Sequence, residues 1–447
     1  MIKIYDTMTR SLRDFVPLTE NVVNMYVCGP TVYNYIHIGN ARSAVAFDTI
    51  RRYFEYCGYT VNYISNFTDV DDKIIKAANE AGISTKELSD KFIAAFMEDT
   101  GQLGIKPATQ NPRVINYMDE IIAFVSTLVD KGFAYVSEGD VYFRVAKSNN
   151  YAKLANKTLE DLEIGASGRT DAETERKENP LDFALWKAAK EGEVSWDSPW
   201  GPGRPGWHIE CSVMATEILG DTIDIHGGGA DLEFPHHTNE IAQSEAKTGK
   251  TFANYWMHNG FVNVDNEKMS KSLGNFVTVH DMLQTVDGQV LRFFLATQQY
   301  RKPINFTEKA IHDAEVNLKY LKNTHSLPLT DQVNQAELQT YLDAFQEAMD
   351  DDFNTATGVT VLFDMAKWIN SGNYDQTVKD DFEKMLQVFG IVFEEEVLDE
   401  DIEKLIEERQ AARANKDFAT ADRIRDELAA QGIKLLDTKE GVRWTRD

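Results

Sequence analysis

Cysteine and long apolar runs are scarce in this chain of 447 residues. Its three cysteines, Cys28, Cys57 and Cys211, are too few for a disulfide framework and indicate a reducing compartment, the cytoplasm. The apolar runs extend over only a few residues, so we expect no transmembrane helix. The first ten residues carry three charges and no apolar core, and no signal peptide is expected.

Positively charged residues are also few: the chain has 46 lysines and arginines and 72 aspartates and glutamates. A formal net charge of −26 argues against a nucleic-acid partner if it is spread evenly, since phosphate binding needs basic patches. It is not spread evenly. Residues 404–447 hold ten basic and nine acidic residues and directly follow the acidic segment 394–401. The average charge therefore does not exclude a local contact with RNA.

Strand and helix patterns alternate in two parts of the chain, and they are typical of a parallel sheet of the Rossmann type. Strands are expected over residues 22–27, 59–65 and 222–226, and helices over 40–56, 69–81 and 239–248. Between these two parts the sequence pattern is different: it predicts an amphipathic helix over 114–131 and a hairpin around Gly139. We therefore predict an α/β catalytic domain that is split by an insertion.

The rest of the chain has a helical pattern, with no strand expected from residue 279 to 396. Charged helices broken near Asn415 then lead into an extended tail over 433–444. The expected segments are the first half of the catalytic domain (1–110), the connective insertion (111–205), the second half of the catalytic domain (206–250), a region around a lysine-bearing loop (251–306), an α-helical domain (307–396) and a small C-terminal module (403–447).

The common nucleotide and metalloprotease motifs are absent: there is no P-loop, no Gly-x-Gly-x-x-Gly after the first strand and no His-Glu-x-x-His. Two other motifs point to phosphate. His37-Ile38-Gly39-Asn40 stands at a predicted helix start, where free N–H groups suit an anion and a glycine allows close approach. Lys268-Met269-Ser270-Lys271-Ser272 offers two lysines and two hydroxyls, which can neutralise a polyphosphate.

Four further residues form a plausible zinc set: Cys28, Cys211, His236 and Glu240. His236 and Glu240 are four residues apart, so one helical turn places both on the same face. The separation between the two cysteines is far too long for a zinc finger, and a lone cysteine in an apolar stretch is more often part of the core. The residues alone leave both interpretations open.

The two phosphate motifs resemble the HIGH and KMSKS signatures of class I aminoacyl-tRNA synthetases. The second signature is intact, whereas Asn40 replaces the final histidine of the first. Other segments resemble the cysteinyl-tRNA synthetase family within that class, and the resemblance extends through nearly the whole chain. These segments are Met25-Tyr26-Val27-Cys28-Gly29-Pro30-Thr31-Val32-Tyr33, Trp207-His208-Ile209-Glu210-Cys211-Ser212, His226-Gly227-Gly228-Gly229, Phe234-Pro235-His236-His237-Thr238-Asn239-Glu240 and residues 417–426, with Thr438 and Trp444 beyond.

The resemblance implies one zinc ion per chain in the amino-acid pocket, bound by Cys28, Cys211, His236 and Glu240. Zinc with soft ligands prefers a thiolate to an alcohol, which would separate cysteine from serine without an editing site. The insertion is short for a hydrolytic editing domain, in agreement with this interpretation. Cys57 is not in the set, and we expect it in the core.

The resemblance also implies roles for other residues. Cys28, Thr68 and Trp207 would line the amino-acid pocket. His37, Asn40, Lys268 and Lys271 would be catalytic. The ATP-binding residues would be His37, Gly39, Asn40, Gly229, Asp231, Lys268, Ser270 and Lys271. For the remaining histidines of these segments, His208, His226, His237 and also His258, we expect structural roles.

The implied activity is ligation of L-cysteine to tRNA(Cys) by a monomer. ATP, accompanied by Mg²⁺, would convert cysteine to cysteinyl-adenylate, and the 3′-terminal ribose of the tRNA would then take the aminoacyl group, with AMP and diphosphate as the other products. Residues 403–447 would read the anticodon, and Trp444, if exposed, could stack on a base. Two alternatives stay open: a ligase that joins cysteine to an amino sugar, and a non-catalytic paralogue that binds tRNA or zinc.

Overall fold

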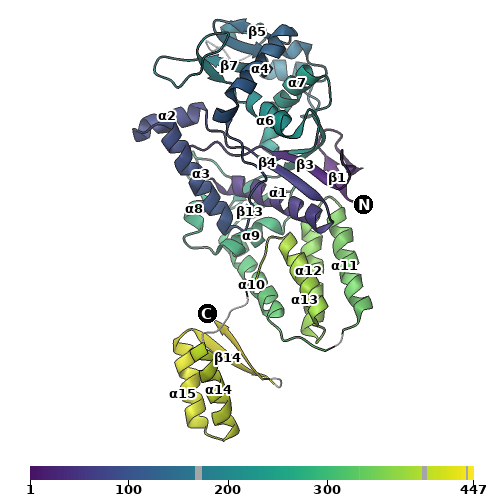
Figure 1. Cartoon of the computed structure of the whole chain (residues 1–447), viewed down its shortest axis with the longest axis vertical. Helices are drawn as coiled ribbons and strands as arrows, with labels where there is room; N and C mark the ends of the chain where they lie inside the picture. The colour runs from purple at the N-terminus through teal and green to yellow at the C-terminus, as the bar shows by residue number, and fades with distance from the viewer. Residues whose placement is uncertain (167–173, 332, 395–399, 439–440, 447) are drawn as a thin grey trace. The chain divides into compact units, whose positions relative to one another are not determined.

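The computed structural model describes residues 1–166, 174–331, 333–394, 400–438 and 441–446. It divides into two compact units, residues 1–392 and residues 393–447, which are described separately (Figure 1). Most of the acidic segment predicted over 394–401 lies outside the described residues, as does part of the insertion. None of the described helices is long and apolar enough to cross a lipid bilayer.

A four-stranded parallel sheet organises the first unit and confirms the predicted Rossmann-type fold. Its order is β10-β9-β3-β4, and every neighbouring pair is parallel. The strands are β3 (Val22–Val27), β4 (Thr60–Ser65), β9 (Ile223–Gly229) and β10 (Ala253–Asn259). Because the strands are parallel, their carboxyl ends share one edge of the sheet, which is where ligands bind in folds of this kind.

Helix α1 (Ile38–Tyr56) follows β3 and packs against the sheet with Val45, Phe47 and Ile50 buried. It begins two residues before the predicted start because His37 caps it. The His37 side chain accepts a hydrogen bond from the Asn40 N–H, and the Asn40 side chain accepts one from the His37 N–H. Helices α2 (Asp72–Ala81) and α3 (Thr85–Gln102) follow β4.

The insertion contributes α4 (Met118–Asp130), α5 (Leu159–Ala166) and the antiparallel sheet β5-β6-β7-β8. Its strands are Ala134–Ser137, Asp140–Phe143, Phe183–Ala188 and Gly203–Pro205. The predicted hairpin around Gly139 is confirmed. Phe143 and Trp186 of the insertion belong to the same buried cluster as Tyr26 and Ile64 of the catalytic sheet. The insertion and the catalytic sheet thus share one core.

After the insertion the chain forms α6 (Ile209–Leu219) and α7 (Thr238–Thr248), and then the small sheet β12-β11-β13. Strands β11 (Val262–Val264) and β12 (Glu267–Lys268) are joined by β13 (Ile304–Phe306), which pairs in parallel with β11. The expectation that no strand interrupts residues 279–396 is therefore wrong. A strand of three residues has no detectable period, and its partner is some 40 residues away in the chain.

The helical part of the first unit comprises α8 (Val279–Met282), α9 (Gly288–Ala296), α10 (Glu308–His325), α11 (Gln335–Asp350), α12 (Thr355–Asn370) and α13 (Gln376–Val388). Near the N-terminus, β1 (Lys3–Asp6) and β2 (Ser11–Asp14) form a two-stranded antiparallel sheet.

A buried arginine ties three of these segments together. Arg292 on α9 lies 2.6 Å from the Asp48 carboxylate on α1, and both side chains are almost completely buried. Its other donors bond the Phe389 carbonyl at 2.8 Å and the Thr49 hydroxyl at 3.1 Å. Since a buried charge is tolerated only when it is fully paired, these contacts lock α1, α9 and the end of α13 in one arrangement.

The second unit is a helical pair with a hairpin. Helix α14 (Glu400–Ala414) ends before the predicted break, and α15 (Phe418–Ala430) is capped by Asp417. Strands β14 (Ile433–Thr438) and β15 (Gly441–Arg446) make the expected extended tail a hairpin. Trp444 packs against the small core of this unit and is only partly exposed, so the condition that we set for base stacking is not met.

The buried ion pair gives a prediction for stability. Arg292→Met should lower the free energy of unfolding by about 3 kcal/mol, because it leaves the Asp48 carboxylate buried with only part of its compensation. Denaturant titration checks this. The matched control is Lys309→Met, which breaks an exposed pair with Asp313 and should cost less than about 0.5 kcal/mol. Equal effects of the two changes would contradict the role given to Arg292.

Candidate functional site

A cavity of about 670 Å³ opens at the carboxyl edge of the parallel sheet. Of the residues predicted for the site, it is lined by Cys28, His37, Gly39, Asn40, Thr68, Trp207, Cys211, Gly229, Asp231, His236, Lys268, Ser270 and Lys271. Glu240 is the only predicted site residue that does not line the cavity, and it lies directly behind Cys28 and His236. Segments more than 200 residues apart in the chain thus meet in one place.

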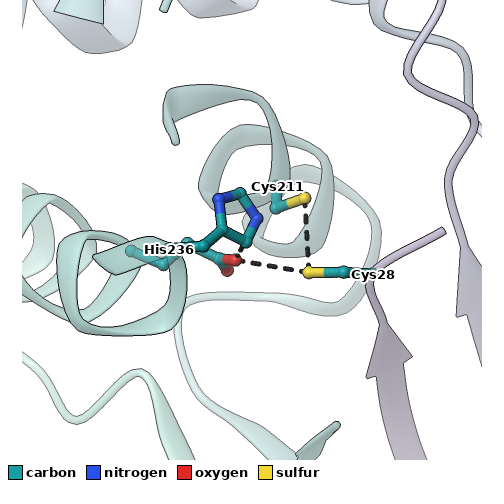
Figure 2. A group of neighbouring side chains, drawn as sticks. Cys28, Cys211 and His236 are labelled. Carbon is teal, nitrogen blue, oxygen red and sulfur yellow. Dashed lines mark hydrogen bonds and ion pairs between the residues drawn. The ribbon is translucent and has the colours of Figure 1, made fainter. Parts of the chain in front are cut away.

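The four predicted metal ligands lie together at the base of this cavity. One ligand atom from each of Cys28, Cys211, His236 and Glu240 lies within 4.8 Å of the others. Figure 2 shows the two sulfur atoms facing each other, 3.5 Å apart, with the His236 ring beside them. Glu240 Oε1 is 2.9 Å from His236 Nε2 and 3.4 Å from the Cys28 sulfur.

Local structure explains this convergence. Cys28 directly follows β3, at the carboxyl edge of the sheet, and Cys211 lies in the first turn of α6. His236 precedes α7 and Glu240 lies in its first turn, so the spacing of four residues keeps both on one face. The common face that we predicted from this spacing is present.

Two histidines expected to be structural lie in direct contact with these four residues. His226 Nε2 is 2.6 Å from Glu240 Oε2, and His237 Nε2 is 3.4 Å from the Cys28 sulfur. Cys28, His226, His237 and Glu240 form a second group whose ligand atoms are equally close. A relay continues outward, since His237 bonds His258 at 2.8 Å and His258 bonds the Thr7 hydroxyl at 2.7 Å.

Charges within the cluster favour a cation. Burial opposes ionisation of the Cys211 thiol, but the hydrogen bond from Cys28 and the proximity of His236 lower its pKa to about 6. Burial likewise opposes ionisation of Glu240, yet His226 and His236 lower its pKa to about 2. Cys211 and Glu240 are therefore anionic near neutral pH, whereas burial holds the pKa of the Cys28 thiol well above its usual value, and, against the effect of burial, Glu240 and Cys211 raise the pKa of His236 to about 10. A bound cation would replace the protons on Cys28 and His236, and such a soft and hard donor set is what zinc binds in proteins.

Polar groups beside the cluster include two residues that the sequence analysis did not single out. Asn66 accepts a hydrogen bond from the Gly29 N–H at 3.0 Å and donates one to the Thr68 hydroxyl at 3.2 Å. The Thr68 hydroxyl in turn donates to Glu210, whose pKa burial raises well above its usual value. Asn66 belongs to none of the segments named above, so only the folded chain brings it beside the cluster, whereas Glu210 stands directly before Cys211 in one of those segments.

Trp207 lies at the mouth of this region. Its indole ring stacks on the His236 imidazole with centroids 4.5 Å apart, and 42% of the residue remains exposed. Cys57 lies elsewhere: it follows the last residue of α1, does not line the cavity and is only partly buried. The expectation that Cys57 belongs to the core is thus too strong, because a residue at a helix end is less enclosed than one on its inner face.

The first phosphate motif forms the N-terminus of α1, as predicted. A Cβ on residue 39 would lie 2.8 Å from the His37 ring, so the glycine makes room for the capping imidazole. Burial lowers the pKa of His37 to about 4, with further lowering by Lys271 and Lys73, and the ring is therefore neutral near pH 7. The Ile38 N–H donates to the Val277 carbonyl and the Asn40 N–H to the His37 ring, so at this helix start the Gly39 N–H and the helix dipole are what suit an anionic ligand.

The second phosphate motif is an exposed loop on the other side of the cavity. Lys271 Nζ lies 5.4 Å from the centroids of the Tyr33 and Phe276 rings and 3.5 Å from the Tyr33 hydroxyl. The Ser270 N–H donates to the Asn275 side chain at 2.8 Å. Asp231 lies at the end of β9, where a Cβ on Gly229 would lie 2.4 Å from its carboxylate.

Comparison with known families agrees with this geometry. Residues 14–316 match the family described as tRNA synthetases class I (C) catalytic domain. Residues 344–394 match the DALR domain, and residues 395–444 match the cysteinyl-tRNA ligase anticodon binding domain.

Related proteins match over the whole length. The cysteine–tRNA ligase of Streptococcus thermophilus (strain CNRZ 1066) is 95% identical over 447 residues, covering 100% of both chains. That of Streptococcus agalactiae serotype III (strain NEM316) is 82% identical with the same coverage. Among solved structures, Mycobacterium tuberculosis methionyl-tRNA synthetase in complex with methionyl-adenylate matches with a TM-score of 0.60 at 15% identity, covering 82% of this chain and 89% of that one, and so supports the fold alone. With its parallel-sheet fold, its site and its full-length relatives in agreement, the chain belongs to the cysteine–tRNA ligase family of class I aminoacyl-tRNA synthetases.

Proposed function

We propose that this chain ligates L-cysteine to tRNA(Cys) in two steps. ATP first activates the amino acid as cysteinyl-adenylate with release of diphosphate, and the 3′-terminal ribose of the tRNA then takes the aminoacyl group with release of AMP. One observation carries the proposal: a single cavity is lined by the two cysteines and the histidine of the ligand cluster and by residues of both phosphate motifs. An amino acid with a thiol side chain and ATP can thus lie side by side.

We infer that Cys28, Cys211, His236 and Glu240 hold one zinc ion. The donor set supports this, because two sulfurs, an imidazole and a carboxylate converge with lowered pKa values for Cys211 and Glu240. When bound, zinc would favour a thiol-bearing substrate over an alcohol and so separate cysteine from serine. His226 would orient Glu240 through its 2.6 Å contact, as outer partners of metal ligands commonly do.

In the activation step, we propose that the chain acts by positioning and by charge. The carboxylate of cysteine attacks the α-phosphorus of ATP, and diphosphate leaves. His37 and Asn40, with the open helix N-terminus at Gly39, would hold the ATP phosphates, and Lys268, Ser270 and Lys271 would stabilise the charge that develops on the leaving group. Gly229 and Asp231 would bind the adenosine, and Mg²⁺ would accompany the phosphates.

Thr68 and Trp207 would complete the amino-acid pocket around Cys28. The Thr68 hydroxyl is held by Asn66 and Glu210, so it is fixed before a ligand arrives. One chain supplies all of these groups, which supports a monomer as the working unit. The three free cysteines support a reducing cytoplasm as the location.

For the transfer step, we propose that the C-terminal module contacts the anticodon. The match of residues 395–444 to an anticodon binding domain supports tRNA as the acceptor and disfavours an amino sugar. The intact lysine loop disfavours a paralogue without catalysis. Arg423 and Arg425 are exposed, and their described partners are acidic residues of the same helix, weak surface pairs that a phosphate could replace. Arg409, by contrast, is paired with Asp437 by two hydrogen bonds of 2.9 Å.

The metal can be tested by substitution. The protein should carry about one zinc per chain, and Cys211→Ser should lose most of it because a serine hydroxyl is a poor zinc ligand. Cys57→Ser is the matched control and should keep its zinc. Elemental analysis after dialysis measures both variants. Full zinc retention in Cys211→Ser would rule out the assigned ligand set.

The lysine loop can be tested by kinetics. Lys271→Ala should lower kcat for cysteine-dependent ATP–pyrophosphate exchange by roughly 10²-fold or more, with a smaller change in KM for cysteine, the pattern of a contact made in the transition state. Lys309→Ala, a change of an exposed lysine on α10, should leave both constants unchanged. A change confined to KM for cysteine would make the loop a substrate clamp.

The C-terminal module can be tested by truncation after Val392, the last residue of the first unit. ATP–pyrophosphate exchange should survive nearly intact, because every cavity residue lies before this point. Charging of tRNA should fall through weaker binding, and the salt dependence of tRNA binding should flatten as phosphate contacts vanish. If the truncated enzyme charged tRNA as well as the full chain, the module would not be the anticodon reader, and the amino-sugar alternative would gain ground.

A further inference from the structure

Backbone pairing joins the first phosphate motif to the segment that follows the lysine loop. The Ile38 N–H donates to the Val277 carbonyl at 3.1 Å, and the Val279 N–H donates to the Ile36 carbonyl at 2.9 Å. These bonds form an antiparallel bridge between His37 and Thr278. The segment that returns from the lysine loop therefore runs directly along the segment that enters the first motif.

Side chains on both sides of this bridge form a small cluster. Tyr35 and His280 stack with ring centroids 4.2 Å apart and planes 14° apart. His280 Nδ1 lies 3.1 Å from the Asp99 carboxylate on α3, and Phe92 on the same helix packs edge-on against Tyr35 at 5.2 Å. Tyr35, His280 and Asp99 are called the root clamp below, because they lie where the chain rejoins the fold after the loop.

Asp99 is an unusual residue for its position. It is buried in the last turn of α3, where the helix dipole disfavours negative charge. Among the described residues, its Oδ2 atom has no hydrogen-bond partner, and its Oδ1 atom is bonded by His280. A buried carboxylate at this end of a helix lowers stability unless it is compensated, which makes His280 the group that holds it.

The loop itself has few anchors. Residues 271–274 are exposed, and the Lys271 side chain contacts only the rings of Tyr33 and Phe276 and the Tyr33 hydroxyl among the contacts described. The position of the Lys271 side chain therefore depends mainly on where the two ends of the loop are attached to the fold, which we call the root of the loop. An ångström of misplacement at a catalytic charge is enough to slow a reaction strongly.

We propose that Tyr35, His280 and Asp99 are positioning residues for the activation step, which hold the root of the lysine loop at a fixed distance from His37. They touch no substrate and act through Lys271. This inference rests on the proposed function, in which Lys271 stabilises the departing diphosphate. It assigns a role to three residues that belong to neither signature and stand at positions 35, 99 and 280 of the chain.

A double-mutant cycle tests the proposal in the full-length, zinc-bound enzyme. Tyr35→Leu removes the ring that stacks on His280 and should lower kcat for ATP–pyrophosphate exchange by roughly tenfold or more, with KM for cysteine and zinc content unchanged. Tyr35→Phe keeps the ring and should behave like the parent enzyme. His280→Asn, which retains a donor toward Asp99, should lose less than His280→Ala.

The decisive measurement is Tyr35→Leu in the Lys271→Ala background. If the clamp acts through Lys271, the second substitution should change kcat by less than about twofold once the lysine is gone. Full additivity of the two losses, or a loss in Tyr35→Phe equal to that in Tyr35→Leu, would overturn the clamp. If Lys271→Ala alone left kcat unchanged, the assigned role of the loop would fail instead, so the two failures are distinguishable.

A second set of measurements tests whether a loss of activity in Tyr35→Leu is caused by a loss of folding. The thermal midpoint and zinc content of Tyr35→Leu should stay near those of the parent, and ATP should protect Lys268 and Lys271 from trypsin less well in the variant. Undiminished protection together with unchanged kcat would overturn the proposal, whereas a collapsed thermal midpoint would make Tyr35 a residue of the core and overturn it equally.

Discussion

The pocket depends on keeping Glu240 ionised in a place with no access to water. Removing a carboxylate from water lowers stability by several kcal/mol unless partners replace the lost hydration. Here His226 and His236 bond its two oxygens at 2.6 and 2.9 Å, and Cys28 approaches at 3.4 Å. This requirement explains why several histidines lie around the cavity. Two of them bond Glu240, and each of these imidazoles must in turn be held in its orientation by neighbouring groups.

A comparable constraint operates in the middle of α1. The N-terminus of this helix carries the first phosphate motif, while Asp48 in its middle is held by Arg292. Arg52 adds a second contact to Asp48 at 2.8 Å. One helix thus connects the first phosphate motif to the helical part of the unit, and paired charges rather than apolar contacts alone set its orientation.

Local patterns predicted much of the fold. The bounds of β3 and the break between α14 and α15 are as expected, since apolar runs and helix-ending residues act over a few positions. The four predicted metal ligands lie together, and residues of both phosphate motifs line the same cavity. Features that depend on distant pairing were missed: β13 has only three residues and gains its identity from β11.

The same limit applies to single side chains. Structural roles were expected for His226 and His237, and their contacts with Glu240 and Cys28 are those of hydrogen-bonded supporting side chains; only the folded chain shows which residues they support. Base stacking by Trp444 was considered only on the condition that the side chain is exposed; it pairs across the hairpin with Leu435 and packs against the small core of the second unit. Burial of this kind is a property of the assembled chain.

The shared core of the insertion and the catalytic sheet limits how this enzyme can be rearranged. Phe143 and Trp186 share one cluster with Tyr26 and Ile64, so no polar seam separates the two parts. In a chimera that carries an insertion from another protein, the new side chains would have to reproduce the shapes of those rings. Otherwise a water-filled cavity would remain beneath β3. The insertion therefore cannot be exchanged by itself. Within the class, we expect a recombinant to fold only if the core residues of its insertion match those of its catalytic sheet.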